Sequence, residues 1–497
     1  MSSTPLMMNW TAVLPQALLL AAACLVALVD LWVKHPQRLP TYLLTQASLL
    51  VVAVLHLAYF EDGFTLYAMQ RMMVADPMGH LMGFFATVSL MICLAYARPY
   101  AESRDLLKGE LYSLSLFSLL GILVMLSANN FLVVYLGLEV MSLSLYALVA
   151  LRRDNLAATE AAMKYFVLGA LSSGFLLYGL SMMYGATGSL DIPEVFNAIA
   201  TGQINKSVLV FGLVFIVAGL GFKLGAVPFH MWVPDVYQGA PTAITMMIAG
   251  APKLAAFAIA FRLLVEGMLG LAFDWQQMLL VMAVASLVLG NLAAIAQTNI
   301  KRMLGYSTIS QMGFVLLGMG AGVVHGNTLS AANAYMSSMF YVVTYVLTTL
   351  GTFGVLMLMC RKDVEVEQVS DLAGLARRSP WLAGVMAIYM FSLTGIPPMV
   401  GFYAKVSVLQ ALISTNVTGY LVLAVVAVLL SLVGAFYYLR IVKVMYFDEP
   451  VDPAPIVSTT EAKAVMSLNG AAVILLGILP GGLMALCARA ILQAVAT

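Results

Sequence analysis

The chain has 497 residues, of which 62% are hydrophobic and only 9% are charged. Soluble domains carry about 25% charged residues, so the composition excludes an ordinary soluble protein and predicts a membrane protein. The formal net charge is +1, and no run rich in Lys or Arg occurs, so nucleic-acid binding is not expected. The four cysteines form no CxxC pair, and we predict no metal site in this chain.

Fourteen apolar segments are long enough for helices that cross a membrane, which takes about 20 apolar residues each. None has the alternating pattern of a barrel strand. The first 33 residues contain no Lys or Arg, so we expect the first segment to be a retained span and not a signal peptide. The segments are 10–33, 41–60, 76–97, 109–128, 130–151, 161–184, 207–240, 241–265, 275–298, 303–323, 330–359, 381–413, 417–446 and 464–490. We therefore predict an all-α polytopic membrane protein with 14 transmembrane helices.

Positive charges collect on one set of loops. The loops after odd-numbered spans, counted with the adjoining span ends, hold sixteen of the 24 Lys and Arg side chains: Lys34, Arg38, Arg98, Arg104, Lys108, Arg152, Arg153, Lys301, Arg302, Arg361, Lys362, Arg377, Arg378, Arg440, Lys443 and Lys463. The loops after even-numbered spans hold three, namely Arg71, Lys206 and Arg262. Because cytoplasmic loops are enriched in Lys and Arg, we predict that the loops after odd-numbered spans lie in the cytoplasm and that both termini face outward, which requires an even number of spans.

The seventh and twelfth segments are too long for one straight span, and each is interrupted by glycine and proline. We expect helical hydrogen bonding to be lost at Gly219–Pro228 and at Leu393–Met399. Paired broken helices are typical of inverted repeats. We therefore predict two inverted five-helix repeats, spans 4–8 and 9–13, with broken helices 7 and 12. The expected divisions are an N-terminal three-helix segment (1–108), the two repeats (109–266 and 267–447) and a C-terminal helix (448–497).

Four ionisable side chains lie well inside apolar spans: Glu139, Lys223, Lys253 and Lys405. A charge at the bilayer centre costs roughly 2.5–3.5 kcal/mol, so each is a functional candidate. Burial disfavours the charged ammonium, which makes the lysines candidate proton carriers. We expect Glu139 to lie within ion-pair reach of Lys223. The alternative for this pair is a static ion pair that holds spans 5 and 7 together.

Two other candidates leave alternatives open. Lys164 opens the sixth span, where it either joins a proton path or extends to the membrane surface. His230 follows Pro228, where it either relays protons near neutral pH or caps broken backbone. In the tenth span, the set Tyr306, Ser307, Ser310 and Gln311 would bind a chain of water or pack helices together, and packing is the favoured interpretation.

Three sequence stretches resemble a known family. They are GFKLGAVPFHMWVPDVYQGAP (221–241) with the later Pro252-Lys253, EAAMKYFVLGALSSGFLLYG (160–179) and SLTGIPPMVGFYAK (392–405). The chain is similar to the antiporter-like membrane subunits of respiratory complex I, and the sequence motif DVYQGAP (235–241) resembles that of the subunit N family of NADH-quinone oxidoreductase. The resemblance covers nearly the whole chain. It implies fourteen helices, two inverted five-helix repeats, and a proton path through Glu139, Lys164, Lys223, Lys253 and Lys405.

The resemblance also implies a function and its partners. The expected function is proton translocation in the membrane arm of NADH:quinone oxidoreductase, so the chain would be an enzyme only as a subunit of this translocase. NADH, flavin, iron–sulfur clusters and quinone would be held by partner subunits, among them neighbouring antiporter-like subunits, with no cofactor in this chain. One departure concerns Gln311, since relatives often carry a histidine there and glutamine does not titrate. The alternative functions are a multisubunit cation/proton antiporter and a passive membrane scaffold.

Overall fold

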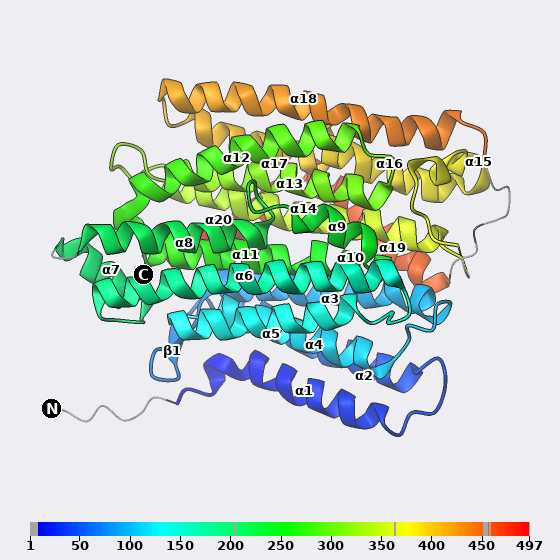
Figure 1. The fold of residues 1–497 in the computed structure, drawn as a ribbon, viewed down its shortest axis with the longest axis horizontal. Helices are drawn as coiled ribbons and strands as arrows, with labels where there is room; N and C mark the ends of the chain where they lie inside the picture. The colour runs from blue at the N-terminus through cyan, green and yellow to red at the C-terminus, as the bar shows by residue number, and fades with distance from the viewer. Residues whose placement is uncertain (1–7, 203–204, 362–363, 451–455, 457–458, 497) are drawn as a thin grey trace.

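The computed structural model describes residues 8–202, 205–361, 364–450, 456 and 459–496. Long helices run in roughly one direction and form a broad bundle (Figure 1). Within the described residues, twelve helical segments are long and apolar enough to cross a membrane. The prediction of a polytopic helical membrane protein is therefore confirmed.

The first part of the chain contains six long helices and one small hairpin. The elements are η1 (Thr11–Val13), α1 (Leu14–Asp30), α2 (Leu39–Asp62), β1 (Leu66–Ala68), β2 (Met73–Ala75), α3 (Pro77–Glu102), α4 (Gly109–Leu126), α5 (Phe131–Val149) and α6 (Leu156–Thr187). The antiparallel hairpin departs from the purely helical prediction. Its two strands are only three residues long, too short to give an alternating pattern in the sequence.

The middle of the chain is the most interrupted. It contains α7 (Ile192–Thr201), α8 (Lys206–Leu224), α9 (Trp232–Gly239), α10 (Thr242–Ala249), α11 (Ala251–Ala260), a π-helical turn η2 (Phe261–Glu266) and a short 3₁₀ turn η3 (Leu269–Leu271). The seventh expected span is thus α8 and α9, separated by a non-helical turn. The break begins at Gly225 and not at Gly219, because the helix continues to Leu224. The eighth expected span is also divided, at Gly250, where α10 ends and α11 begins.

The last part of the chain contains α12 (Ala272–Ile295), α13 (Ile300–Met319), α14 (Ala331–Met359), η4 (Val369–Leu372), α15 (Leu375–Arg378), α16 (Pro380–Thr394), α17 (Val400–Ile413), α18 (Thr418–Phe447), α19 (Thr460–Ile478) and α20 (Gly481–Ala496). The break between α16 and α17 confirms the prediction for the twelfth span. The single C-terminal helix expected at 464–490 is wrong, since α19 and α20 are separated at Leu479 and Pro480. Proline removes a backbone donor and disfavours helical geometry in the residue before it.

Burial divides the helices into a centre and a periphery. The most apolar eighteen-residue windows of α10–η2 and of α14 are 100% and 94% buried, whereas that of α18 is only 17% buried. In Figure 1, α18 and α1 form opposite edges of the bundle. The central α10–α11 segment is therefore shielded from lipid, and α18 covers the second broken helix from outside.

Both described chain ends lie at the hairpin end of the bundle. Ala12 and Val13 pack against Ala68 and Ala75 of the hairpin, and Val495 lines a cavity beside the same strands. The chain therefore starts and finishes at one end, as expected for an even number of crossings.

Two side chains counted as loop charges are buried within the bundle. Arg262 is 1% exposed, in the π-helical turn, and Lys301 is 2% exposed, in α13. Lys362, from the same count, lies outside the described residues. The positive charges that remain on the α5–α6 connection and on α15 still lie opposite the hairpin end (Figure 1).

This arrangement predicts the orientation of the chain. Reporter fusions after Arg153 and after Arg378 should both give a cytoplasmic signal, because both follow positively charged connections at the same end of the bundle. A fusion after Gly63, at the hairpin end, should give the opposite signal and serves as the control. A periplasmic signal at either arginine would contradict this orientation.

Candidate functional site

The first site is built where α8 stops. Gly225 takes a left-handed conformation with φ of 80°, and its N–H donates to Gly221 and Phe222. The last two helical carbonyls, those of Lys223 and Leu224, then face the interior. Lys253 of α11 reaches both, with Nζ donating over 3.2 Å to Lys223 O and over 2.9 Å to Leu224 O. Lys253 is fully buried.

The second site repeats this arrangement where α16 stops. Gly395 takes a φ of 89°, and its N–H donates to Phe391 and Ser392 over 3.0 Å each. The carbonyls of the two residues before the glycine again accept from a lysine. Lys405 Nζ lies 3.0 Å from Leu393 O and 2.8 Å from Thr394 O, and it also donates to Ser431 Oγ over 2.8 Å.

Both ammonium groups are held by dipoles. The carbonyl end of a helix carries partial negative charge, which favours a cation there. Aromatic faces add to this, since Lys253 Nζ lies 5.2 Å from the Trp232 ring centroid and Lys405 Nζ lies 5.4 Å from that of Phe314. A lysine held by carbonyl oxygens can give up its proton without leaving a buried carboxylate unpaired. This distinguishes the arrangement from a permanent ion pair.

Glu139 and Lys223, which we expected within ion-pair reach, form no ion pair within 4.0 Å in this structure. Both residues are described, and Lys223 Nζ donates instead to Ser142 Oγ over 2.9 Å. Ser142 lies one turn beyond Glu139 on α5. Glu139 sits beside the exposed apolar face formed by Leu136 and Val140, and its Oε1 is buried without a partner. The sequence could not separate these two faces because α5 is apolar all round.

A hydrogen-bonded network of neutral side chains adjoins the second site. Gln311 Nε2 donates to Leu393 O over 3.1 Å and to the Tyr438 hydroxyl over 2.9 Å, and Tyr341 donates to Gln311 Oε1. Ser307 is hydrogen-bonded to Tyr438. Leu393 O therefore accepts from both Gln311 and Lys405, and one carbonyl joins the network to the lysine.

Two predicted site residues lie away from the buried lysines. Lys164 is partly exposed and pairs with Glu160 over 2.8 Å and with Asp235 over 2.9 Å; Asp235 also pairs with Arg302 over 2.5 Å. These four side chains line a cavity of about 260 Å³ at the bundle rim. His230 lies in the turn between α8 and α9, with its Nδ1 buried and unpartnered.

Glu365, a loop residue that the sequence analysis did not single out, binds side chains at the start of α10 and at the end of α3. Glu365 pairs with Arg104 over 2.6 Å and accepts hydrogen bonds from Tyr100 and, over 3.3 Å, from Thr242 at the start of α10. Burial alone would raise the pKa of Glu365, but the positive charges of Lys301 and Arg104 and the Tyr100 hydrogen bond outweigh it and lower that pKa. The long loop of the second half is thereby fixed to the first half.

Comparisons with known proteins identify the family of this chain. Residues 128–431 match the family model described as NADH:quinone oxidoreductase/Mrp antiporter, TM. The chain is 63% identical over 487 residues to NADH-quinone oxidoreductase subunit N of Polaromonas naphthalenivorans (strain CJ2), covering 97% of each chain. It is 60% identical over 494 residues to the subunit of the same name from Herminiimonas arsenicoxydans, covering 99% of each.

A solved structure gives the same fold. The chain resembles a chain of respiratory complex I from Thermus thermophilus with bound aureothin, with a TM-score of 0.80 and 29% sequence identity. The match covers 95% of this chain and 99% of that one.

The helix end at Gly395 gives a prediction about stability. A Cβ on Gly395 would lie 2.9 Å from Lys405 Cδ, and its left-handed backbone costs a non-glycine residue roughly 1–2 kcal/mol. Gly395→Ala should therefore lower the thermal unfolding midpoint of the detergent-solubilised protein. Gly384→Ala, in α16 with open space around it, is the matched control and should leave the midpoint unchanged or raise it, because alanine favours a helix more than glycine does. Equal midpoints for both variants would contradict the strain at Gly395.

Proposed function

Because the chain belongs to the NADH-quinone oxidoreductase subunit N family, we propose that it translocates protons in the membrane arm of NADH:quinone oxidoreductase. The observation that carries this proposal is the repeated geometry in which a buried lysine holds the last two carbonyls of an interrupted helix. Such a lysine is desolvated, lies within the membrane and is bound by dipoles. These are the conditions under which a proton is exchanged and not held permanently.

Lys253 is the central proton carrier in this proposal. Its ammonium binds the carbonyl of Lys223, so the two charged side chains occupy neighbouring positions at one helix end. When Lys223 carries a proton, the like charge disfavours a second ammonium beside it. When Glu139 is ionised, its negative charge opposes that effect. Proton exchange at the first site is therefore coupled to the charge on α5.

Lys405 is the proton carrier of the second half. Gln311 does not titrate, but its amide links the shared Leu393 carbonyl to the hydroxyls of Tyr341 and Tyr438. Hydroxyls both donate and accept, so they can pass a proton where a histidine is absent. Lys164 and His230 belong to the entry side of the path in this proposal, with Lys164 at the rim cavity and His230 in the first break.

The layout that we propose has fourteen spans, with α13 and the pair α16–α17 added to the twelve segments identified by length and apolarity. Residues 1–108 form the N-terminal segment, 109–266 and 267–447 the two inverted repeats, and 448–497 the C-terminal part. The matching glycine caps at 225 and 395 support this layout. The two lysines occupy different places in the two repeats. Lys253 lies on the span that follows the broken helix α8–α9, whereas Lys405 lies on α17, the second half of the broken helix itself.

The redox chemistry belongs to partner subunits in this proposal. NADH, flavin, iron–sulfur clusters and quinone are held there. The redox reaction is coupled to proton translocation in this chain through the neighbouring membrane subunits. The chain lies in the bacterial inner membrane with both termini in the periplasm. Its similarity over nearly its full length to proteins named subunit N favours this assembly over a separate cation/proton antiporter.

Substitution of Lys253 tests the proposal. Lys253→Ala should leave assembly intact but impair NADH-driven proton uptake and the electron transfer coupled to it. Lys253→Arg should impair both as well, because guanidinium does not release its proton in proteins. Proton uptake and NADH oxidation are measured in membrane vesicles, with assembly followed on native gels. Lys443→Ala, at an exposed lysine paired with Asp448, is the control and should behave like the wild type.

The opposite pattern would identify a scaffold. If arginine were tolerated and alanine prevented assembly, Lys253 would be a structural cation. Full proton uptake by an assembled Lys253→Ala complex would remove Lys253 from the path.

A further inference from the structure

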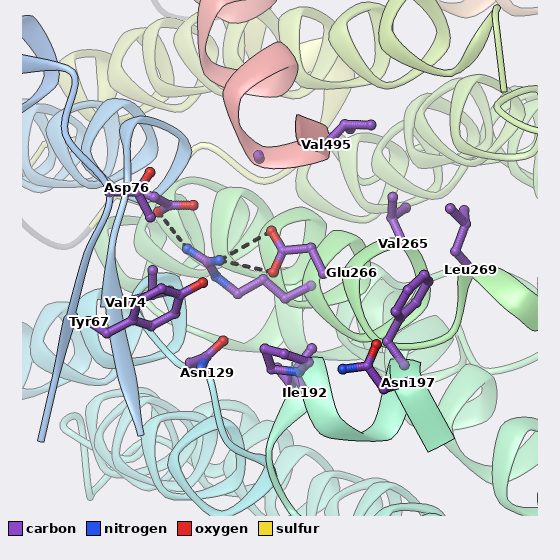
Figure 2. A pocket seen from close by; sticks show the side chains of 15 residues that line it. Tyr67, Val74, Asp76, Asn129, Ile192, Asn197, Val265, Glu266, Leu269 and Val495 are labelled. Atoms are coloured by element: carbon purple, nitrogen blue, oxygen red, sulfur yellow. Dashed lines mark hydrogen bonds and ion pairs between the residues drawn. The ribbon is translucent and has the colours of Figure 1, made fainter. Parts of the chain in front are cut away.

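A second buried charged cluster lies at the hairpin end of the bundle, away from the lysines. Arg262 of the π-helical turn donates to Asp76 Oδ1 over 2.7 Å and to Glu266 Oε2 over 3.1 Å. Its Nε and Nη2 also donate to the carbonyl of Leu126 at the end of α4, over 2.9 and 2.6 Å. Figure 2 shows Asp76 and Glu266 on the wall of a cavity, and the dashed lines mark these charged contacts.

This cluster contains one more carboxylate than charge balance with Arg262 requires. Asp76 and the Leu126 carbonyl bind Nε and Nη2 of Arg262, whereas Glu266 binds Nη1. Asp76 is further held by the Gly79 N–H at the start of α3. Among the described residues, Glu266 has only the Arg262 guanidinium as partner, and its side chain is 19% exposed. One cation beside two carboxylates leaves a net negative charge in a buried place, which is costly unless a proton is bound. Glu266 is the group that can bind it.

Two histidines extend the cluster along α3. His80 follows Asp76 by one turn of α3, where its backbone N–H donates to the backbone carbonyl of Asp76, and His80 Nδ1 lies 3.1 Å from His56 Nδ1. Both rings are buried, at 4% and 2% exposure, and Tyr59 packs edge-on against His80. Two facing Nδ1 atoms share one proton, so the pair can take either of two tautomeric arrangements. His56 Nε2 is buried without a partner.

The cavity connects this cluster to the end of the bundle. Its volume is about 380 Å³, and its lining includes Tyr67, Asn129 and Asn197 with the two carboxylates (Figure 2). A site of this size with several polar groups has room for water. The cavity adjoins the hairpin, opposite the loops rich in Lys and Arg, which is the periplasmic side in the proposed orientation. The π-helical turn that carries both Arg262 and Glu266 is a geometry often found at functional sites.

We propose that Glu266, held beside Arg262 in the cluster that Asp76 and His80 extend along α3, is a proton-release site that exchanges with water in this cavity. The proton leaves as an O–H proton of the carboxyl group and passes to cavity water, so only this O–H bond breaks. Arg262 stays protonated and holds the carboxylate in place. This inference rests on the proposed function, since it names the outlet of the same proton path.

Everted membrane vesicles test the site, because their lumen corresponds to the periplasm. NADH-driven proton uptake is measured while the lumen pH is varied over the range of about pH 5 to 8. Uptake by the wild type should fall as the lumen is acidified, since a release site that stays protonated cannot pass its proton on. Glu266→Gln should move the midpoint of this fall by about one pH unit or abolish the dependence. Glu266→Asp, which keeps a carboxylate, should restore it.

The control is a carboxylate at the same end of the bundle. Glu61 is exposed and pairs with Arg489 over 3.3 Å, so Glu61→Gln should show the wild-type profile. A wild-type midpoint in assembled Glu266→Gln overturns the release site. If Glu266→Gln does not assemble, His80→Gln is measured instead, and a wild-type midpoint there overturns the proposal too. Absence of proton uptake by wild-type vesicles would contradict the proposed function itself, a different outcome from an unaltered profile.

Discussion

The structure depends on how backbone carbonyls are satisfied where a helix stops inside the membrane. Unpaired carbonyls in an apolar environment cost several kcal/mol, so a break is tolerated only where other groups bind them. Here the ammonium groups of Lys253 and Lys405 do so. A buried lysine is itself costly. Each of the two costly features supplies a partner that the other lacks, so each lowers the cost of the other.

This mutual dependence also explains where the two sites lie. The first is enclosed by the α10–α11 segment, whose most apolar window is completely buried, so the ammonium of Lys253 is separated from lipid on every side. The second is covered by α18, whose most apolar window is mostly exposed, and Lys405 donates a third hydrogen bond to Ser431 of that helix. A site nearer the edge needs this additional polar partner, because fewer protein layers hold its lysine in place.

The sequence predicted the elements that depend on local composition. Apolar runs gave most spans, glycine and proline gave both broken helices, and isolated charges identified Lys253 and Lys405. It could not predict which groups the buried lysines bind. Ser142, the partner of Lys223, Ser431, a partner of Lys405, and the freed carbonyls are brought close to the lysines only by packing. Arg262 was assigned to a loop because it follows an apolar run, whereas its partner Asp76 lies 186 residues earlier. The hairpin, the break at Pro480 and the displaced Glu139 escaped prediction for related reasons.

The shared Leu393 carbonyl gives the second half a way to respond to its own charge state. A carbonyl has two lone pairs, and here one accepts from Lys405 and the other from Gln311. Loss of the proton from Lys405 weakens its hydrogen bond to the Leu393 oxygen, since charge-assisted hydrogen bonds are about twice as strong as neutral ones. Gln311 can then bind the carbonyl more closely and release Tyr438, which shifts the hydroxyl contact with Ser307. In the proposed function, a non-titrating glutamine therefore transmits the protonation state of the lysine through the orientation of its neighbours, without a histidine at this position.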